Sequence, residues 1–79
     1  MNQIEKFIQK LEKEVALRMI VVLRDVAQLN LDHLDVKKLQ GFKDLYRVRT
    51  GKIRIVFRKA ADQGIIIAIE FRGKVYREL

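Results

Sequence analysis

Apolar residues in the first 29 positions of the chain recur at steps of three and four, which is the spacing of one face of an α-helix. They are Ile4, Phe7, Ile8, Leu11, Val15, Met19, Val22, Leu23, Val26 and Leu29. Mostly polar and charged side chains stand between them. The pattern predicts helix over about residues 3–29. The charged stretch 12–14 divides it into a short and a longer helix, a helical hairpin, although no glycine or proline marks the break.

The second half of the chain changes to alternating apolar and polar positions. Residues 30–35, rich in asparagine and aspartate, predict the loop that leaves the helices. Three β-branched runs follow, and they predict strands at about residues 45–50, 52–59 and 64–71. Helices followed by a meander of strands indicate an α+β fold. We expect the N-terminal helical hairpin to pack on one face of an antiparallel sheet of three strands, or four.

Length and composition narrow the possible chemistry. The 79 residues predict one domain, residues 1–79, with an open groove rather than a deep cavity. The chain has no cysteine, and its one histidine, His33, falls in the predicted loop, where we interpret it as a surface residue. We therefore expect no metal and no cofactor. The longest apolar runs have five residues, and the chain does not begin like a secretory signal, so we expect a cytoplasmic protein without a membrane partner.

The charge is unevenly distributed along the chain. The formal net charge is +7, but residues 1–35 carry five basic and six acidic side chains, whereas residues 36–79 carry twelve and four. The whole excess therefore lies in the half that forms the sheet. This distribution indicates that the sheet meets a polyanion such as nucleic acid, or an acidic protein. Basicity that serves solubility alone is the alternative.

The first two strands concentrate this charge on one face. The Thr-Gly pair at 50–51 predicts a two-residue turn that places Arg49 opposite Lys52 and Arg47 opposite Arg54. An apolar face toward the helices would then contain Tyr46, Val48, Ile53, Ile55 and Phe57. The other face would contain Arg47, Arg49, Lys52, Arg54 and Arg58. Like charges directly opposite each other destabilise a strand pair, so the stacked cations predict a site built for an anion.

The third strand continues both faces. We expect Ile65, Ile67, Ile69 and Phe71 to face the helices. We expect the opposite face to contain Ile66, Ala68, Glu70 and Arg72. One permitted register sets Glu70 directly across from Arg54, either as a salt-bridge partner or as a proton acceptor. Tyr76, near the open end of that face, would stack on a base or donate a hydrogen bond, or is an ordinary amphipathic terminal residue.

Three segments, in this order, resemble the RelE/ParE superfamily of toxins from type II toxin–antitoxin systems, and its RelE-like branch in particular. They are residues 35–41 (DVKKLQG), 45–57 (LYRVRTGKIRIVF) and 71–77 (FRGKVYR). The resemblance implies a RelE-like fold and a ribosome-dependent endoribonuclease that cuts messenger RNA, inhibits translation and is restrained by a cognate antitoxin. The implied partners are therefore the antitoxin, messenger RNA and the ribosome.

The resemblance also implies roles for particular residues. Arg54 matches the arginine that holds the scissile phosphate, Arg72 the arginine near the leaving group, and Tyr76 the tyrosine that orients the nucleotide. Arg47 and Arg49 match positions where several members carry basic side chains facing the cleavage site. The full set expected to contact RNA is Arg47, Arg49, Lys52, Arg54, Arg58 and Lys74.

The implied reaction needs a group that accepts the proton of the attacking 2′-hydroxyl. Arginine almost never gives up its own proton, whereas a lysine among cations does so more readily. Lys52 is therefore the candidate base, and Glu70 is the second.

Two departures from the family pattern keep other functions open. Family members begin with a strand before the first helix, but here the helical pattern starts by Ile4, and Phe71 stands where many members have histidine. One alternative is a ParE-like inhibitor of DNA gyrase. The other is a catalytically degenerate module that binds RNA or an antitoxin.

Overall fold

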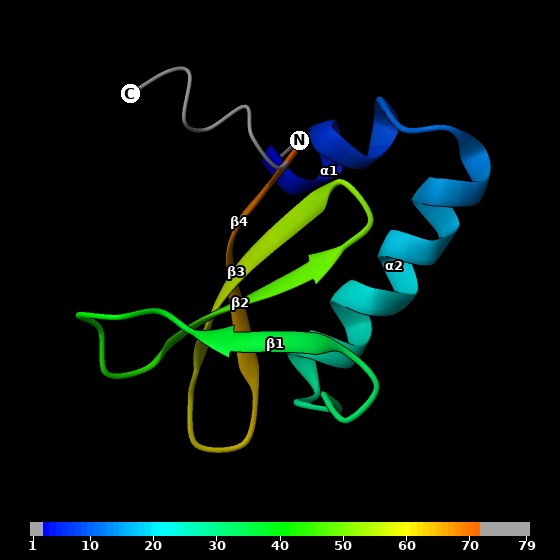
Figure 1. Ribbon diagram of the computed structural model, residues 1–79. Helices are drawn as coiled ribbons and strands as arrows, with labels where there is room; N and C mark the ends of the chain where they lie inside the picture. Colours follow the sequence, from blue (N-terminus) through cyan, green and yellow to red (C-terminus); the bar gives the residue numbers. More distant parts are fainter. Residues whose placement is uncertain (1–2, 72–79) are drawn as a thin grey trace.

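The computed structural model describes residues 3–71, which form two helices and four strands. Helices α1 (Gln3–Gln9) and α2 (Lys13–Ala27) are followed by strands β1 (Asp35–Lys38), β2 (Leu45–Thr50), β3 (Ile53–Lys59) and β4 (Gly64–Phe71). The strands form one antiparallel sheet in the order β1-β2-β3-β4. Figure 1 shows the helices on one side of this sheet. The predicted α+β fold, a helical hairpin on an antiparallel sheet, is confirmed, and the sheet has four strands.

Residues 10–12 separate the two helices, although none of them is glycine or proline. The amides of Lys10 and Leu11 donate to the carbonyls three residues earlier, at 3.1 Å, which closes α1 in a tight turn. Glu12 then has extended backbone angles and is the N-cap of α2. Leu11 packs against the core, so the apolar stripe continues through the break. The break therefore changes the direction of the chain without removing the apolar face.

Leu29, two residues after the end of α2, has an unusual conformation for a bulky residue. Its φ is +59°, in the left-handed region that favours glycine. The amide of Leu29 donates to the carbonyl of Val26 at 3.0 Å, and the amide of Asn30 donates to that of Asp25 at 2.8 Å. These two bonds form a Schellman motif, which satisfies carbonyls at the helix end. Leu29 also packs against the core, and this contact offsets its backbone strain.

The core lies between α2 and the covered face of the sheet. The buried apolar residues are Met19, Val22, Val26, Val48, Ile53, Ile55, Phe57 and Ile69. Helix α1 contributes at the edge of this core, where the ring of Phe7 lies 4.8 Å from that of Phe71 between centroids. Every strand residue in the buried set belongs to the face that was expected to be apolar.

Strand β1 was not among the three strands expected, the first of which was predicted to begin at residue 45. It is an edge strand of four residues, in which Val36 pairs with the buried Val48 of β2. Its one apolar residue gives no alternating pattern. Only pairing with β2 makes it a strand, and local sequence does not contain that information.

The β2–β3 register differs from the expected one by two residues. Gly51 and Lys52 form the turn, Thr50 pairs with Ile53, and Arg49 pairs with Arg54. Gly51 has φ +59° at the first central position, where type II′ turns place glycine. The predicted Arg49–Lys52 and Arg47–Arg54 pairs are therefore wrong. A shift of one residue would exchange the two faces, but a shift of two preserves them, so the apolar pattern could not distinguish these registers.

A β-bulge in β4 corrects the expected orientation of its first half. Val56 pairs with Ala68 but Phe57 pairs with Ile66, which leaves Ile67 without a cross-strand partner. The extra residue reverses the alternation. Ile66 packs against the core, whereas Ile65 and Ile67, expected to face the helices, are 43% and 46% exposed. The expected orientation of Ile69 and Phe71 is confirmed.

Two contacts hold the end of α2 against its neighbours. Gly64 is buried at the start of β4, and a Cβ atom there would collide with the carbonyl oxygen of Val26. The carboxylate of Asp25, mostly buried, meets Nε2 of His33 at 2.9 Å. His33 therefore fastens the exit loop to the last turns of α2, a role that the sequence did not reveal.

Candidate functional site

A row of four charged side chains crosses the open face of the sheet, one from each strand. Asp35 pairs with Arg49, Arg49 with Arg54, and Arg54 with Glu70. Two arginines are thus adjacent at the centre, and a carboxylate stands on each outer strand. Nε of Arg49 donates to Oδ2 of Asp35 at 3.3 Å, between side chains that are both largely exposed. The like-charge repulsion at the centre is offset by the carboxylates at the two ends.

Arg54 and Glu70 form the more enclosed half of this row. Nη2 of Arg54 donates to Oε1 of Glu70 at 2.9 Å, and the two side chains are 18% and 30% exposed. The predicted register that places Glu70 across from Arg54 is confirmed, as is the salt bridge. The bond also holds the carboxylate of Glu70 in a fixed position on the cationic face.

Arg47 lies in the neighbouring row and differs from the other arginines. It pairs with Lys37 on one side and Val56 on the other, so β1 brings a second cation rather than a carboxylate. Its Nη1 atom is buried and has no hydrogen-bond acceptor among residues 3–71. A buried donor without an acceptor costs about 1–3 kcal/mol, and this nitrogen can still donate to a bound anion or to water.

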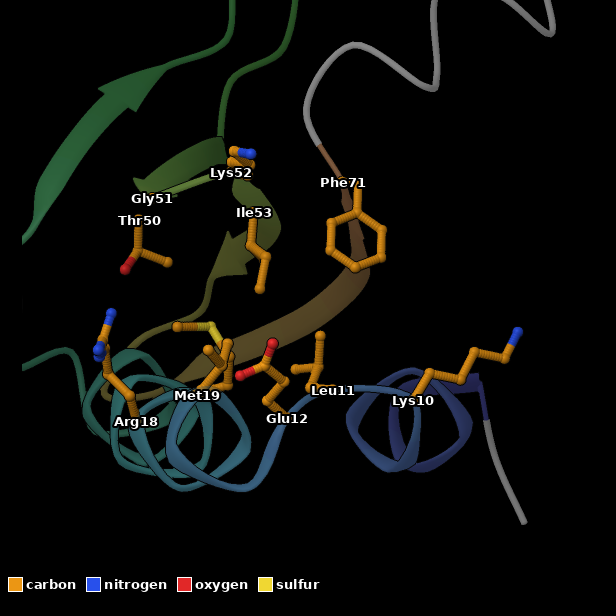
Figure 2. A pocket seen from close by; sticks show the side chains of 11 residues that line it. Lys10, Leu11, Glu12, Arg18, Met19, Thr50, Gly51, Lys52, Ile53 and Phe71 are labelled. Carbon is orange, nitrogen blue, oxygen red and sulfur yellow. The ribbon is translucent and has the colours of Figure 1, made fainter.

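Lys52 lies away from the arginines, contrary to expectation. It occupies the β2–β3 turn, is exposed, and is not paired with Arg49. It lines an open hollow of about 460 Å³ between that turn and the helices, whose apolar floor includes Met19, Ile53 and Phe71. Figure 2 shows Arg18 extending from α2 toward the strand side of this hollow. Within residues 3–71, Lys52 therefore has no arginine directly across from it, and the crowding by cations that suggested it as a base is not observed.

The other predicted site residues fall into two groups. Arg58, at the outer end of β3, is exposed, and its Nε atom lies 3.8 Å from Oδ2 of Asp44. Residues Arg72, Lys74 and Tyr76 lie outside the described residues, so their expected roles stay predictions. The structure thus brings Arg47, Arg49, Arg54 and Glu70 onto one face and separates Lys52 from them.

Strand β1 contributes to this face, and this contribution was not predicted from the sequence. Asp35 and Lys37 occupy alternate positions of a four-residue strand, where they pair with Arg49 and Arg47. Lys38 is charged as well, so these four residues show no clear alternation, and a strand there was not predicted. Among residues 3–71, no three histidine, aspartate or glutamate side chains gather closely enough to hold a metal ion. Within the same residues, no helix is long and apolar enough to cross a membrane.

Two helices on one face of a four-stranded antiparallel sheet, with arginines on the other, form a RelE-like toxin fold. The structure is similar to a chain in the crystal structure of the RelB-RelE antitoxin-toxin complex from Methanococcus jannaschii, with a TM-score of 0.73. The match covers 94% of this chain and 89% of that chain, at 22% sequence identity. No protein-family model and no curated protein sequence matches the chain. The likeness is therefore one of fold, and it agrees with the family resemblance of the sequence.

Proposed function

We propose that this protein is the toxin of a toxin–antitoxin system and that it cleaves messenger RNA on the ribosome. The observation that carries the proposal is the open face of the sheet, where a buried nitrogen of Arg47 has no acceptor among residues 3–71, near the Arg54–Glu70 pair. Phosphate oxygens form strong, often bidentate hydrogen bonds with a guanidinium. The fold shared with the RelB-RelE antitoxin-toxin complex supports the toxin assignment.

The arrangement suits cleavage by the RNA's own 2′-hydroxyl. The 2′-oxygen forms a bond to the adjacent phosphorus, its proton passes to the carboxylate of Glu70, and the bond from phosphorus to the 5′-oxygen breaks. The 2′-oxygen and the phosphorus then form a 2′,3′-cyclic phosphate, and the departing 5′-oxygen takes up a proton from water. Arg47 and Arg54 stabilise the charge that develops on the phosphoryl oxygens. Glu70 replaces Lys52 as the preferred base because it is held on the arginine face at 2.9 Å from Arg54.

The proposed antitoxin is an acidic protein, and the two edges of the sheet indicate where part of it binds. Edge strand β1 has four residues, three of them charged, which is a protected edge. Edge strand β4 has eight residues with Glu70 as its one charge, and it exposes Ile65 and Ile67. An extended antitoxin segment with apolar side chains would pair with β4 and place its acidic residues over the arginines.

The decisive experiment compares the wild-type chain with Arg54→Ala after induced expression in a bacterial host. We expect growth arrest and new messenger RNA 5′ ends in translated frames with the wild type, and neither with Arg54→Ala. Arg18→Ala removes the same charge from the helical layer and should leave cleavage intact. Circular dichroism of both variants verifies that they are folded.

Other outcomes select the alternatives. Arrest without new 5′ ends would favour a ParE-like inhibitor of DNA gyrase, and cleavage that persists in Arg54→Ala would exclude the proposed role of this arginine. No arrest at all would favour a module that only binds RNA or antitoxin. Co-purification with the acidic product of the adjacent gene separates these cases further. If Arg54 serves catalysis, Arg54→Ala should lose cleavage but keep the complex, because pairing with β4 and the other arginines still hold the antitoxin. If the face serves binding alone, the variant should lose the complex as well.

A further inference from the structure

The face of α2 that points away from the sheet is apolar, like the face that points toward it. Met19, Val22 and Val26 are buried against the sheet, whereas Leu17, Ile20 and Val21 are 56%, 52% and 45% exposed. In Figure 1, no described segment lies over this outer side of α2. A helix that is apolar on both sides is normally covered on both sides. The second apolar face therefore indicates an interaction surface.

The outer face of α2 also carries a self-complementary charge pattern. Glu14, Leu17, Val21 and Arg24 follow each other at steps of three, four and three residues, so they form one stripe along the helix. The stripe is acidic at its beginning, apolar in its middle and basic at its end. Glu14 and Arg24 are both exposed, and neither has an ion-pair partner within the described residues.

We propose that this stripe is a homodimer interface in which the α2 helices of two copies cross in antiparallel orientation. A two-fold axis at the level of Met19 places Leu17 against the partner's Val21 and Glu14 against the partner's Arg24, and symmetry repeats each contact. In a parallel arrangement, Glu14 would face Glu14 and Arg24 would face Arg24. The order of charges along the stripe therefore selects the antiparallel dimer.

The apolar surface beside the stripe extends the interface. Ile20 and Leu23 of α2 and Ile4 and Ile8 of α1 line an open hollow of about 380 Å³. In the antiparallel arrangement this hollow lies beside the crossing helices and is covered when they meet. Contact between the two apolar surfaces removes both from water, which drives association.

The charge distribution favours a second copy over an acidic partner at this surface. Residues 1–29, which include both helices, carry five basic and four acidic side chains and are nearly neutral, whereas the basic excess lies in residues 36–79. Contact through the helical layers keeps the two basic sheet faces on opposite sides of the dimer. An acidic antitoxin finds its charge complement on the sheet instead, so both partners can bind at once. This inference does not depend on the proposed RNA cleavage.

The test is the mass of the full-length chain in solution, measured by sedimentation equilibrium over micromolar to hundred-micromolar concentrations. We expect a reversible monomer–dimer equilibrium. Ile20→Lys should raise the dimer dissociation constant at least about tenfold, the effect of losing one well-buried apolar contact. Glu14→Arg and Arg24→Glu should each weaken the dimer, and the double variant should restore it because the exchanged charges complement each other again. Lys43→Glu, an equal charge change in the exposed loop between β1 and β2, should leave the equilibrium unchanged.

Three results would overturn the proposal. A monomer at every concentration would show that the surface does not bind a second copy, and would leave a different partner to cover it. A double variant as weak as the single variants would exclude the Glu14–Arg24 contact. Dimerisation unaffected by Ile20→Lys would place the interface elsewhere. Circular dichroism shows in each case whether the variant is folded.

Discussion

The two faces of the sheet use the same strands for opposite purposes. On the covered face, Val48, Ile55 and Phe57 are fully buried in the apolar core. On the open face, the charges alternate with small and branched residues, and each ion pair is at least partly exposed. The covered face therefore determines stability, whereas the open face retains a cost in the buried nitrogen of Arg47. This difference teaches that substitutions on the two faces should separate folding from function.

The largest loss of stability is expected when the covered face is opened. Ile55→Ala should lower the free energy of unfolding by about 2–5 kcal/mol, because it leaves a cavity at a fully buried position. Ile67→Ala is the matched control, since the same atoms are removed from a side chain that is 46% exposed. Urea denaturation measures both. Equal losses would contradict the assignment of the two faces.

A somewhat smaller loss is expected at the contact between β4 and α2. Gly64→Ala should cost about 1–3 kcal/mol, because its Cβ meets the backbone of Val26, which cannot move aside as a flexible side chain would. Gly41→Ala is the control for the methyl group in open space, although its φ of +86° adds a backbone cost of about 1–2 kcal/mol. Thermal unfolding compares the two variants. A Gly64→Ala protein as stable as the wild type would show that this contact relaxes freely.

The partly buried Arg54–Glu70 pair on the open face should affect both stability and RNA cleavage. Glu70→Gln should lower the free energy of unfolding by about 1 kcal/mol, since the pair is partly screened by solvent. If Glu70 is the proton acceptor, the same variant should reduce RNA cleavage at least about 100-fold. Cleavage of a defined messenger RNA on purified ribosomes measures the second effect. Normal cleavage by a folded Glu70→Gln protein would return Glu70 to a structural role.

The exposed Arg49–Asp35 pair, at the other end of the row, should contribute less to stability than the Arg54–Glu70 pair. Arg49→Ala should change the free energy of unfolding by about 0.2–1 kcal/mol, the range of exposed ion pairs. Denaturation at low and high salt distinguishes this effect from lost packing, because salt screens the pair. A loss above about 2 kcal/mol would show that Arg49 packs more tightly than its exposure indicates.

A substitution of Arg47 should reduce RNA cleavage without reducing stability. Arg47→Met removes a buried donor that has no acceptor within the described part of the chain, so the free energy of unfolding should stay within about 1 kcal/mol of the wild type or rise. Cleavage should fall about 100-fold, the effect of losing one donor that stabilises transition-state charge. Denaturation and the ribosomal cleavage assay together test this separation. A large loss of stability would mean that Arg47 serves the fold.

The bulge and the hairpin turn show where sequence reasoning stopped. The run of isoleucines from Ile65 to Ile67 offers apolar side chains at both parities, so alternation could not show that Ile67 is the extra residue. The two hairpin registers differ by two residues and give the same faces, so the turn had to be resolved by the structure. The prediction of the site was affected in the same way. Its arginines were found on one face, but Lys52 was placed among them by the wrong register.

The sequence by itself determined the helical hairpin, the three longer strands, the apolar face and the gathering of basic residues on the other face. These follow from periodicity and charge, which act between residues close in the chain. Only the tertiary structure decided that β1 joins the sheet, that Arg49 lies beside Arg54, and that Arg47 is left without an acceptor among residues 3–71. Those features depend on pairings between strands, because a strand's partner and register are fixed by packing across the whole sheet rather than by its own residues.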